Sequence, residues 1–388
     1  MRIVHVITRL ILGGAQENTV LTCEDLLHRH GDEVVLVTGP PLGPEGSLVA
    51  RARANGVPLL IVDALRRPIH PWRDARSYWA LRAVFRRLRP EVVHTHSAKG
   101  GFLGRPAAFS LGVPAVVHTV HGAPFHPYQS AAARRFFILC ERWAARRSHA
   151  LISVADAMTD LLVRAGVAPP ERFTTIYSGM EVEPFLAAAA DRARVRAELG
   201  FSPEEVVVGK IARLFYLKGH HDVITAARQV VQRAPQVRFL LIGDGLLRER
   251  LVHRIAAEGL APYFRFTGLV PPERIPELIA AMDVLVHTSL REGLARVLPQ
   301  ALISGKPAVS YDVDGAREVV STDETGVLLR PGDVEGLAEA LVRLAGDAAL
   351  RASLGEEGRR RCIDRFRHER MTEEIRRLYQ RVLAGQSR

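Results

Sequence analysis

The chain has 388 residues, which is enough for two domains of about 100–200 residues each. Hydrophobic residues make up 47% and charged residues 24%, a balance that excludes a disordered or collagen-like chain. The formal net charge is +11, and the only lysines are Lys99, Lys210, Lys218 and Lys306, so the basic excess is almost entirely arginine. Codon bias in a GC-rich genome and selection for an acidic partner explain this excess equally well.

The cysteines and the apolar segments indicate the compartment. Cys23, Cys140 and Cys362 are odd in number and far apart, which gives neither a disulfide framework nor a metal-ligand spacing. The first residues run directly into a strand pattern without the features of a signal peptide. No stretch approaches the ~18 apolar residues that a membrane span needs. We expect a cytoplasmic protein whose contact with a membrane would be peripheral, on the inner face of the cell membrane.

Short apolar runs alternate with helical patterns along the whole chain. In the first half a helix over 15–30 ends at Gly31, and in the second half a helix covers 219–233. The predicted strands cover 3–7, 33–38, 59–62, 92–94, 115–119, 150–154, 206–211, 239–242, 264–267, 284–287, 308–311 and 326–328. Continuous apolar strands separated by helices predict parallel sheets that are buried on both faces. The expected fold is α/β, with two Rossmann-like doubly wound domains facing a cleft and an Ala-rich linker over 185–197.

Two fixed cations follow the first strand of the second half. Arg213 and Lys218 stand between the strand over 206–211 and the next helix, at the strand's carboxyl end. Ligands bind at that end of open α/β sheets. The planar guanidinium and the compact ammonium together suit a diphosphate.

Glycine turns follow two later strands. Gly243-Asp244-Gly245 ends one strand and allows close backbone approach. The segment 289–294 follows another strand and precedes a helix over 298–302, whose first N–H groups are suited to phosphate oxygens.

The order and spacing of these segments resemble a known family. The stretch from Arg213 through Gly326 resembles the donor domain of the family-4 glycosyltransferases, which are retaining enzymes with the two-domain GT-B fold. The first half adds Gly13-Gly14-Ala15, His94-Thr95-His96-Ser97 and Thr119-Val120-His121-Gly122, so the resemblance covers nearly the whole chain. It implies an acceptor-side domain over 1–185, a nucleotide-sugar donor domain over 186–365, and a helix over 366–388 that packs back on the first domain.

The resemblance assigns roles in the second domain. Arg213 and Lys218 would bind the donor diphosphate and neutralise charge as the nucleotide leaves. Glu292 would contact sugar hydroxyls, as the first glutamate of the Glu-x7-Glu motif. Gln300 stands where the second, ribose-binding glutamate belongs, and the family's Gly-Gly before Glu318 is altered to Gly315-Ala316. The implied donor-binding residues also include Gly243, Asp244, Gly268, Gly293 and Leu294.

In the first domain, Gly13 and Gly14 would let the backbone approach the donor phosphate, although they also fit a simple tight turn. His121 corresponds to a family histidine close to the reaction centre; a lone histidine at such a place is more often a core residue. His94 and His96 suit packing or acceptor hydrogen bonds, and zinc lacks a third ligand at a readable spacing.

We expect neither a metal nor a cofactor beside the UDP- or GDP-linked donor. Asp312-Val313-Asp314 follows a strand in the manner of an Asp-x-Asp metal motif, but the fixed cations Arg213 and Lys218 make an ion redundant. No pair of carboxylates indicates a double displacement. We therefore expect a front-face reaction in which the departing phosphate takes the acceptor's proton.

We expect the acceptor to be a glycan or a polyprenyl- or other lipid-linked sugar of bacterial cell-surface synthesis. Residues 66–89 hold eight arginines and one acid, interleaved with aromatics, and 134–147 is similar. These stretches fit an anionic membrane surface and, equally, exposed helix faces. No motif for nucleic acid accompanies them.

Three other functions compete with the transferase. An epimerase or a phosphorylase can use the same fold, and a non-catalytic nucleotide-sugar-binding scaffold would explain Gln300. A dehydrogenase is disfavoured because the first loop lacks Gly-x-Gly-x-x-Gly.

Overall fold

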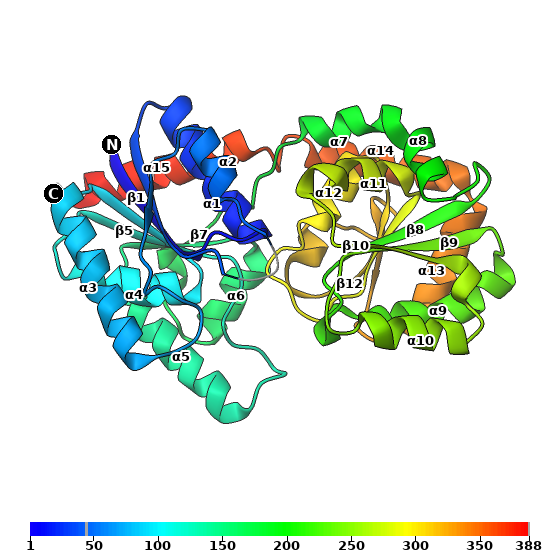
Figure 1. The fold of residues 1–388 in the computed structure, drawn as a ribbon, viewed down its shortest axis with the longest axis horizontal. Helices are drawn as coiled ribbons and strands as arrows, with labels where there is room; N and C mark the ends of the chain where they lie inside the picture. The colour runs from blue at the N-terminus through cyan, green and yellow to red at the C-terminus, as the bar shows by residue number, and fades with distance from the viewer. Residues whose placement is uncertain (43–45, 387–388) are drawn as a thin grey trace. The chain divides into compact units, whose positions relative to one another are not determined.

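The computed structural model describes residues 1–42 and 46–386, and the chain divides into two compact units (Figure 1). The first unit combines Met1–Met180 with Arg367–Arg388, and the second is Glu181–Phe366. The chain therefore leaves the first unit once and returns to it for its last helix. The final two residues of that expected helix lie outside the described residues.

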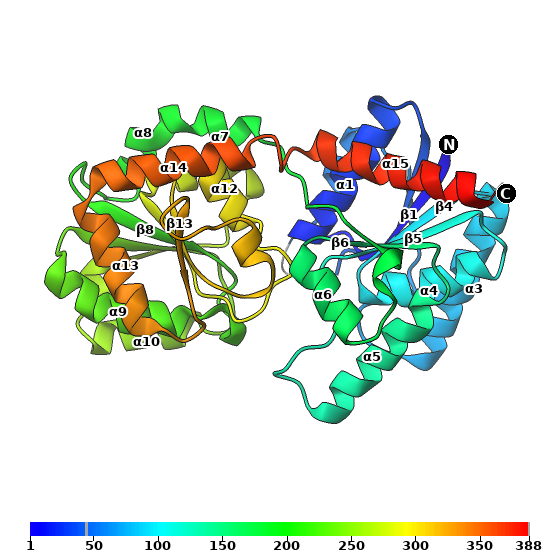
Figure 2. The ribbon, with the colours of Figure 1, turned by 180° about the vertical axis from the view of Figure 1, so that it is seen from behind.

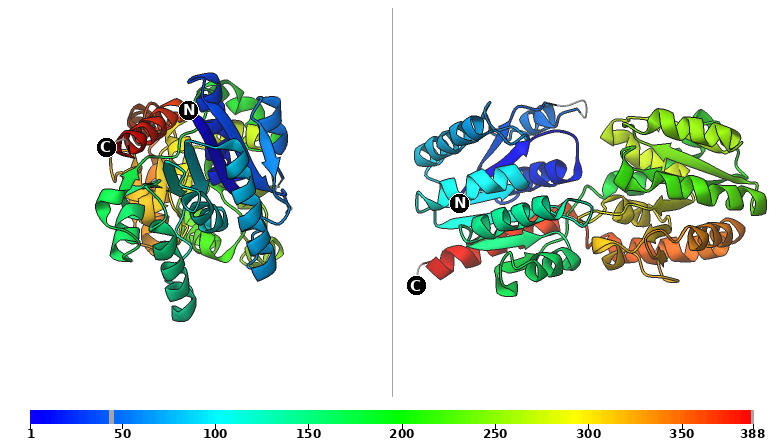
Figure 3. Two further views of the ribbon diagram at one scale, coloured as in Figure 1. Left: turned by 90° about the vertical axis from the view of Figure 1, so that its left-hand side faces the viewer. Right: turned by 90° about the horizontal axis from the view of Figure 1, so that it is seen from below.

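The first unit is built on a seven-stranded parallel sheet with the strand order β3-β2-β1-β4-β5-β6-β7. Helices cover both faces of this sheet (Figure 3). Its elements are β1 (Arg2–Arg9), α1 (Gly14–His28), β2 (Glu33–Gly39), α2 (Val49–Ala54), β3 (Leu59–Ile61), α3 (Pro71–Leu88), β4 (Val92–His96), α4 (Ala98–Phe109), β5 (Ala115–Val120), α5 (Ala131–Ala145), β6 (Ala150–Ser153), α6 (Asp156–Arg164), β7 (Phe173–Thr175) and α15 (His368–Gln386).

The side chains of β1 point alternately to the two faces of the sheet and so contribute to two layers of the core. Ile3 and Ile7 join the cluster formed with α1 and α15, while Val4 and Val6 join the cluster formed with α3 and α4. Successive side chains of a strand point to opposite faces, so the apolar residues of β1 contribute to both layers. His5 therefore shares the α1 and α15 face with Ile3 and Ile7.

Helix α15 packs along α1 in the first unit, as Figure 2 shows. Ile375, Leu378 and Tyr379, which follow one another at helical spacing, are buried in the same cluster as Ile3 and Ile7. Polar contacts add to this packing, because His368 and Thr372 both bond to the buried Asp25 carboxylate of α1. The last helix is thus an integral layer of the first unit.

The second unit is built on a six-stranded parallel sheet with the order β10-β9-β8-β11-β12-β13. Its elements are α7 (Glu183–Ala187), α8 (Arg192–Glu198), β8 (Val206–Ile211), α9 (His220–Arg233), β9 (Val237–Ile242), α10 (Arg248–Ala257), β10 (Phe264–Gly268), α11 (Ile275–Ala281), β11 (Val284–His287), α12 (Val297–Ile303), β12 (Ala308–Tyr311), β13 (Gly326–Leu329), α13 (Val334–Gly346) and α14 (Ala348–Cys362).

Both sheets follow the doubly wound order in which the first strand of the unit lies between the second and the fourth. The expectation of two parallel-sheet α/β domains is confirmed. In each unit the strand order reverses beside the first strand, so a crevice for ligands is expected outside the carboxyl ends of β1 and β4, and of β8 and β11.

The expected linker over 185–197 is wrong. This segment forms α7, a 3₁₀ turn and α8, which pack on α11. Val195 and Arg196 are buried, and Arg196 bonds to Asp283 at the start of β11. The segment looked like a linker because alanine and arginine dominate it, yet alanine is the strongest helix former.

None of the helices that the described residues form combines the length and the apolar character that a membrane crossing requires.

Candidate functional site

The loop after β8 presents two cations with different surroundings. The Arg213 guanidinium is exposed, lies over the Phe215 ring at 5.0 Å, and makes no hydrogen bond or ion pair with any described residue. Lys218 ends a 3₁₀ turn over Tyr216–Lys218, and its Nζ lies 2.5 Å from Glu292 Oε1. The structure thus brings Lys218 and Glu292 together and leaves the Arg213 charge available at the same strand end.

Gly219 makes this loop possible. Its φ is +65°, a conformation that favours glycine, and a Cβ there would lie 1.9 Å from the carbonyl oxygen of Thr288. The Thr288 hydroxyl donates to the Gly219 carbonyl at 2.7 Å and accepts from Lys210 Nζ at 3.0 Å. Burial, together with the nearby Lys218 charge, lowers the pKa of Lys210 to about 7. A buried amine therefore supports the loop from the strand below.

The Glu292 carboxylate is held ionised. Burial by itself would raise its pKa, but the hydrogen bond from His287 and the charge of Lys218 outweigh this effect, and the pKa lies well below its usual range. His287 Nε2 is 3.4 Å from the same Oε1 that Lys218 contacts. A carboxylate fixed in this way accepts hydrogen bonds and is a weak base.

The Asp-x-Asp after β12 serves two separate loop contacts. Asp314 Oδ2 accepts the backbone N–H of Glu292 at 2.6 Å, and Asp312 is bonded to the exposed Arg317. Asp314 has a φ of +48°, and burial raises the pKa of its carboxyl. Asp314 therefore clamps the loop that carries Glu292, a role that the sequence motif did not reveal.

The glycine turns close around the Arg213 loop. Gly243 adopts a φ of +128°, and a Cβ there would lie 2.3 Å from the Ala212 carbonyl oxygen. Its N–H donates to the Gly268 carbonyl at 3.1 Å, while the Asp244 carbonyl accepts from Leu214 N–H at 2.9 Å. The predicted residues Gly243, Asp244 and Gly268 are thus neighbours of Arg213 at one edge of the sheet.

The remaining predicted donor residues follow β11. The Gly293 carbonyl accepts from Gly315 N–H at 3.3 Å, and Leu294 is buried. Helix α12 begins at Val297 and is only seven residues long. Gln300 stands on it half-buried, and its side chain has no hydrogen-bond partner within the described parts of the chain. The Gln300 amide is thus uncommitted among the described residues.

The first unit holds Gly13, Gly14 and His121. Gly13 is the N-cap of α1, and its carbonyl accepts from Glu17 N–H at 2.9 Å. Its φ of 168° is extended backbone, so the close contact is steric: a Cβ would lie 2.7 Å from Gln16 Oε1. His121 follows β5, and its Nε2 is 3.1 Å from His96 Nδ1.

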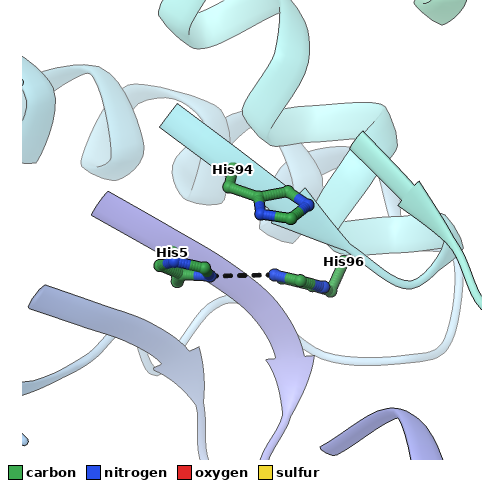
Figure 4. A group of neighbouring side chains, drawn as sticks. All are labelled: His5, His94 and His96. Atoms are coloured by element: carbon green, nitrogen blue, oxygen red, sulfur yellow. Dashed lines mark hydrogen bonds between the residues drawn. The ribbon is translucent and has the colours of Figure 1, made fainter. Parts of the chain in front are cut away.

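His121 lies beside a cluster of three buried histidines, His5, His94 and His96, which Figure 4 shows. The parallel pairing of β1 with β4 sets His5 opposite His94, and His5 Nδ1 lies 3.0 Å from His96 Nε2. His94 bonds through Nδ1 to the Tyr379 hydroxyl at 2.5 Å and through Nε2 to the Thr119 hydroxyl at 2.7 Å. Burial lowers the pKa of His5 to about 3 and those of His94 and His96 well below their usual range, so all three rings are neutral.

The sequence missed His5 as a neighbour of His94 and His96. Ligand atoms of these three side chains lie within 4.8 Å of one another, and three imidazoles are a donor set of the zinc type. Both nitrogens of His94, however, are bonded to hydroxyl groups, and His5 and His96 share a hydrogen bond. The cluster fits a hydrogen-bond network better than a metal site.

Both halves of the chain match family models. Residues 13–179 match the glycosyl transferase 4-like domain, and residues 191–361 match the glycosyl transferases group 1. The chain belongs to the group 1 glycosyltransferases.

Relatives of this glycosyltransferase include the UDP-Gal:alpha-D-GlcNAc-diphosphoundecaprenol alpha-1,3-galactosyltransferase of Escherichia coli, which is 27% identical over 328 residues and 84% of each chain. The 2-deoxystreptamine glucosyltransferase of Streptomyces kanamyceticus is 28% identical over 71% of this chain and 72% of its own. Among solved structures, Anabaena Alr3699/HepE in complex with UDP-glucose gives a TM-score of 0.82 at 22% identity, covering 98% of this chain and 100% of that one. This likeness shows a shared fold.

Proposed function

We propose that this glycosyltransferase moves a sugar, with retention at the anomeric carbon, from a UDP- or GDP-linked donor to a glycan or lipid-linked acceptor of cell-surface polysaccharide or glycolipid synthesis. The observation that carries the proposal is the pairing of Lys218 with Glu292 at the switch point of the second sheet, beside Arg213, which forms no ion pair with another described residue. The activity of the E. coli relative supports a UDP-linked donor and a lipid-linked acceptor.

Arg213 and Lys218 bind the donor diphosphate. Lys218 Nζ carries three N–H donors, of which Glu292 takes one, so donors remain for phosphate oxygens. The Arg213 fork suits bidentate contact with phosphate, and among the described residues its guanidinium has no hydrogen bond or ion pair to give up. These charges stabilise the nucleoside diphosphate as it leaves.

Glu292 orients the donor sugar and does not act as the base. Its depressed pKa makes it a poor proton acceptor, whereas its second oxygen can accept hydrogen bonds from sugar hydroxyls. In the proposed front-face step, the bond between C1 and the phosphate oxygen breaks while the acceptor oxygen bonds to C1 on the same face. The acceptor's proton passes to the departing phosphate oxygen.

The proposed reaction needs no metal ion. Asp314 already accepts the Glu292 N–H, and Asp312 already binds Arg317. The two cations at the strand end supply the charge that a divalent ion would supply.

A binding experiment tests the donor site. Titration calorimetry with UDP, GDP, ADP and CDP, in Mg²⁺ and in EDTA, is expected to give binding of one nucleotide that EDTA leaves unchanged. Arg213→Ala should weaken that binding at least about tenfold, because hydrogen bonds to charged groups are worth about 1.5–3 kcal/mol. Arg228→Ala, which removes an exposed arginine further along α9, should leave it unchanged.

The alternative functions give different results. A nucleotide sugar that binds without transfer or hydrolysis of its sugar would indicate the scaffold. Nucleotide binding that is lost in EDTA would refute the metal-free site. Near-normal turnover of Arg213→Ala or Lys218→Ala would overturn the assigned roles.

We further propose that α3 and α5 dock on an anionic membrane surface. Trp72 is 80% exposed, and Trp79 and Trp143 are also exposed. Arg82 lies over the Trp79 ring at 5.0 Å and Arg147 over the Trp143 ring at 3.9 Å. Aromatic rings beside arginines are typical of surfaces that meet phospholipid head groups. A cavity of about 430 Å³ opens between α3, α4 and α5.

Sedimentation with vesicles tests this surface. The protein should bind phosphatidylglycerol vesicles more strongly than phosphatidylcholine vesicles, and Trp72→Ser should weaken the binding severalfold. Leu246→Ser removes an equally exposed apolar side chain from the second unit and should change nothing. Equal binding of both vesicle types would refute the proposal.

A further inference from the structure

Three imidazoles in the first unit form a hydrogen-bonded row. His5 Nδ1 is 3.0 Å from His96 Nε2, and His96 Nδ1 is 3.1 Å from His121 Nε2. Neighbouring rings are nearly parallel, with interplanar angles of 12° and 28°. His5 comes from β1, His96 from the end of β4 and His121 from the segment after β5, so adjacent strands of one sheet supply the row.

The His5 and His96 rings of this row each carry one proton. His5 and His96 are fully buried, and burial keeps them neutral near pH 7. A neutral imidazole offers one N–H donor and one lone pair, so it can donate on only one side. The two hydrogen bonds must therefore run in the same direction, because His96 cannot donate to both neighbours.

The buried end of the row sets that direction. His5 Nε2 is buried and has no hydrogen-bond partner among the described residues. Orphaned buried N–H groups are rarer than under-satisfied acceptors, so the His5 proton belongs on Nδ1, where it is bonded. His5 then donates to His96 Nε2, and the His96 proton is left on Nδ1, from which it donates to His121 Nε2.

We infer that His5 and His96 are positioning residues that fix the tautomer of His121, with its Nε2 accepting from His96 and its proton held on Nδ1. A group that contacts Nδ1 must then be an acceptor, such as a hydroxyl or phosphate oxygen of the nucleotide sugar. This use of the tautomer rests on the proposed function, but the tautomer itself does not. His94 stands outside the row because hydroxyl groups occupy both of its nitrogens.

Imidazole ¹⁵N spectra of the full-length, histidine-labelled protein at pH 7 test the inference directly. Protonated and unprotonated ring nitrogens of a neutral histidine are distinguishable, and His121→Gln assigns the signals. The Nδ1–H form of His121 is expected in at least about tenfold excess, equivalent to 1.4 kcal/mol. A dominant Nε2–H form would overturn the inference, as would one stoichiometric metal ion in the purified protein.

Two variants test the link from His5 to His121. His5→Phe removes the donor at the start of the row, and His121 should then populate both tautomers. His5→Asn retains an N–H near the Nδ1 position and should preserve the wild-type tautomer. His118 bonds to Thr95 outside the row and should keep its tautomer in both variants, which makes it an internal control for folding.

The outcomes separate this inference from the proposed function. An unchanged His121 tautomer in folded His5→Phe would refute the link while nucleotide binding persists. Failure of every nucleoside diphosphate to bind, with the Nδ1–H tautomer intact, would refute the proposed function and leave the row standing.

Discussion

Replacing Lys218 by methionine removes the charge that faces Glu292 but keeps a side chain of similar length. The Glu292 carboxylate would then retain His287 as its neutral donor at 3.4 Å and would lose the ammonium at 2.5 Å. Its pKa should rise, because the burial that opposes ionisation is no longer offset by an opposite charge. The variant should therefore be less stable near neutral pH, in addition to binding diphosphate weakly.

A double-mutant cycle with Lys218→Met and Glu292→Gln isolates the pair. The side chains are 20% and 22% exposed, between a buried pair, whose disruption costs about 3–5 kcal/mol, and a surface pair, which is worth about 0–1 kcal/mol. We expect a coupling energy of about 1–3 kcal/mol. The Arg233–Glu339 pair is 47% and 57% exposed and provides the matched control, with an expected coupling below about 1 kcal/mol.

The measurement must report on the second unit. All three tryptophans, at positions 72, 79 and 143, lie in the first unit, so their fluorescence does not follow the second. Hydrogen exchange of backbone amides in β8 and β11 provides the local free energy of opening. Tryptophan fluorescence then serves as a control that should stay unchanged.

The pH dependence gives an independent check. Because the folded pKa of Glu292 lies below its unfolded value of about 4.3, the stabilisation is present above that value and is lost as the pH falls towards the folded pKa. The coupling should therefore be complete at pH 7. A coupling at pH 7 no larger than that of Arg233–Glu339 would refute the reasoning.

Three further predictions follow from the second unit. Gly219→Ala should destabilise this unit by several kcal/mol in hydrogen exchange, because its Cβ would meet the Thr288 carbonyl, whereas Gly112→Ala, also at positive φ but in open space, should cost only about 1 kcal/mol. Gln300→Glu should tighten nucleoside diphosphate binding about tenfold in calorimetry, through a charge-assisted bond to the ribose. Stability should rise between pH 7 and 9 in the wild type, since the folded pKa of Lys210 is about 7 and the unfolded chain binds more protons there, and Lys210→Met should flatten this rise in thermal unfolding.

The strands could be predicted from the sequence where continuous apolar runs form them. The expected ranges 206–211, 284–287 and 308–311 coincide with β8, β11 and β12. Strand β7 was missed because it has only three residues, of which two are threonine, and all three are half-buried. The error at 185–197 has a different origin: only tertiary packing on α11 distinguishes a short Ala-rich helix from a connecting segment.

The placement of Lys218 and Glu292 at strand ends could be predicted because parallel strands bring their carboxyl ends to one edge. Their direct contact and the roles of Asp314 and Lys210 could not. Asp314 acts on a backbone N–H that lies 22 residues earlier, and no periodicity encodes such a loop contact. Lys210 is a charged residue within a strand pattern, and this indicates an unusual interior position. The pattern does not indicate that Thr288 accepts its hydrogen bond.

The neighbours of His5 could be predicted in part from the sequence. Once β4 is known to lie beside β1, the register follows, with Ile3 opposite Val92 and therefore His5 opposite His94. Alternation then puts His96 on the same face as His5, and a sheet covered on both faces keeps their rings dry and neutral. The sheet topology therefore predicts that His5 and His96 are neighbours. The contact with His121, which lies beyond the end of β5, depends on the conformation of a loop and could not be predicted.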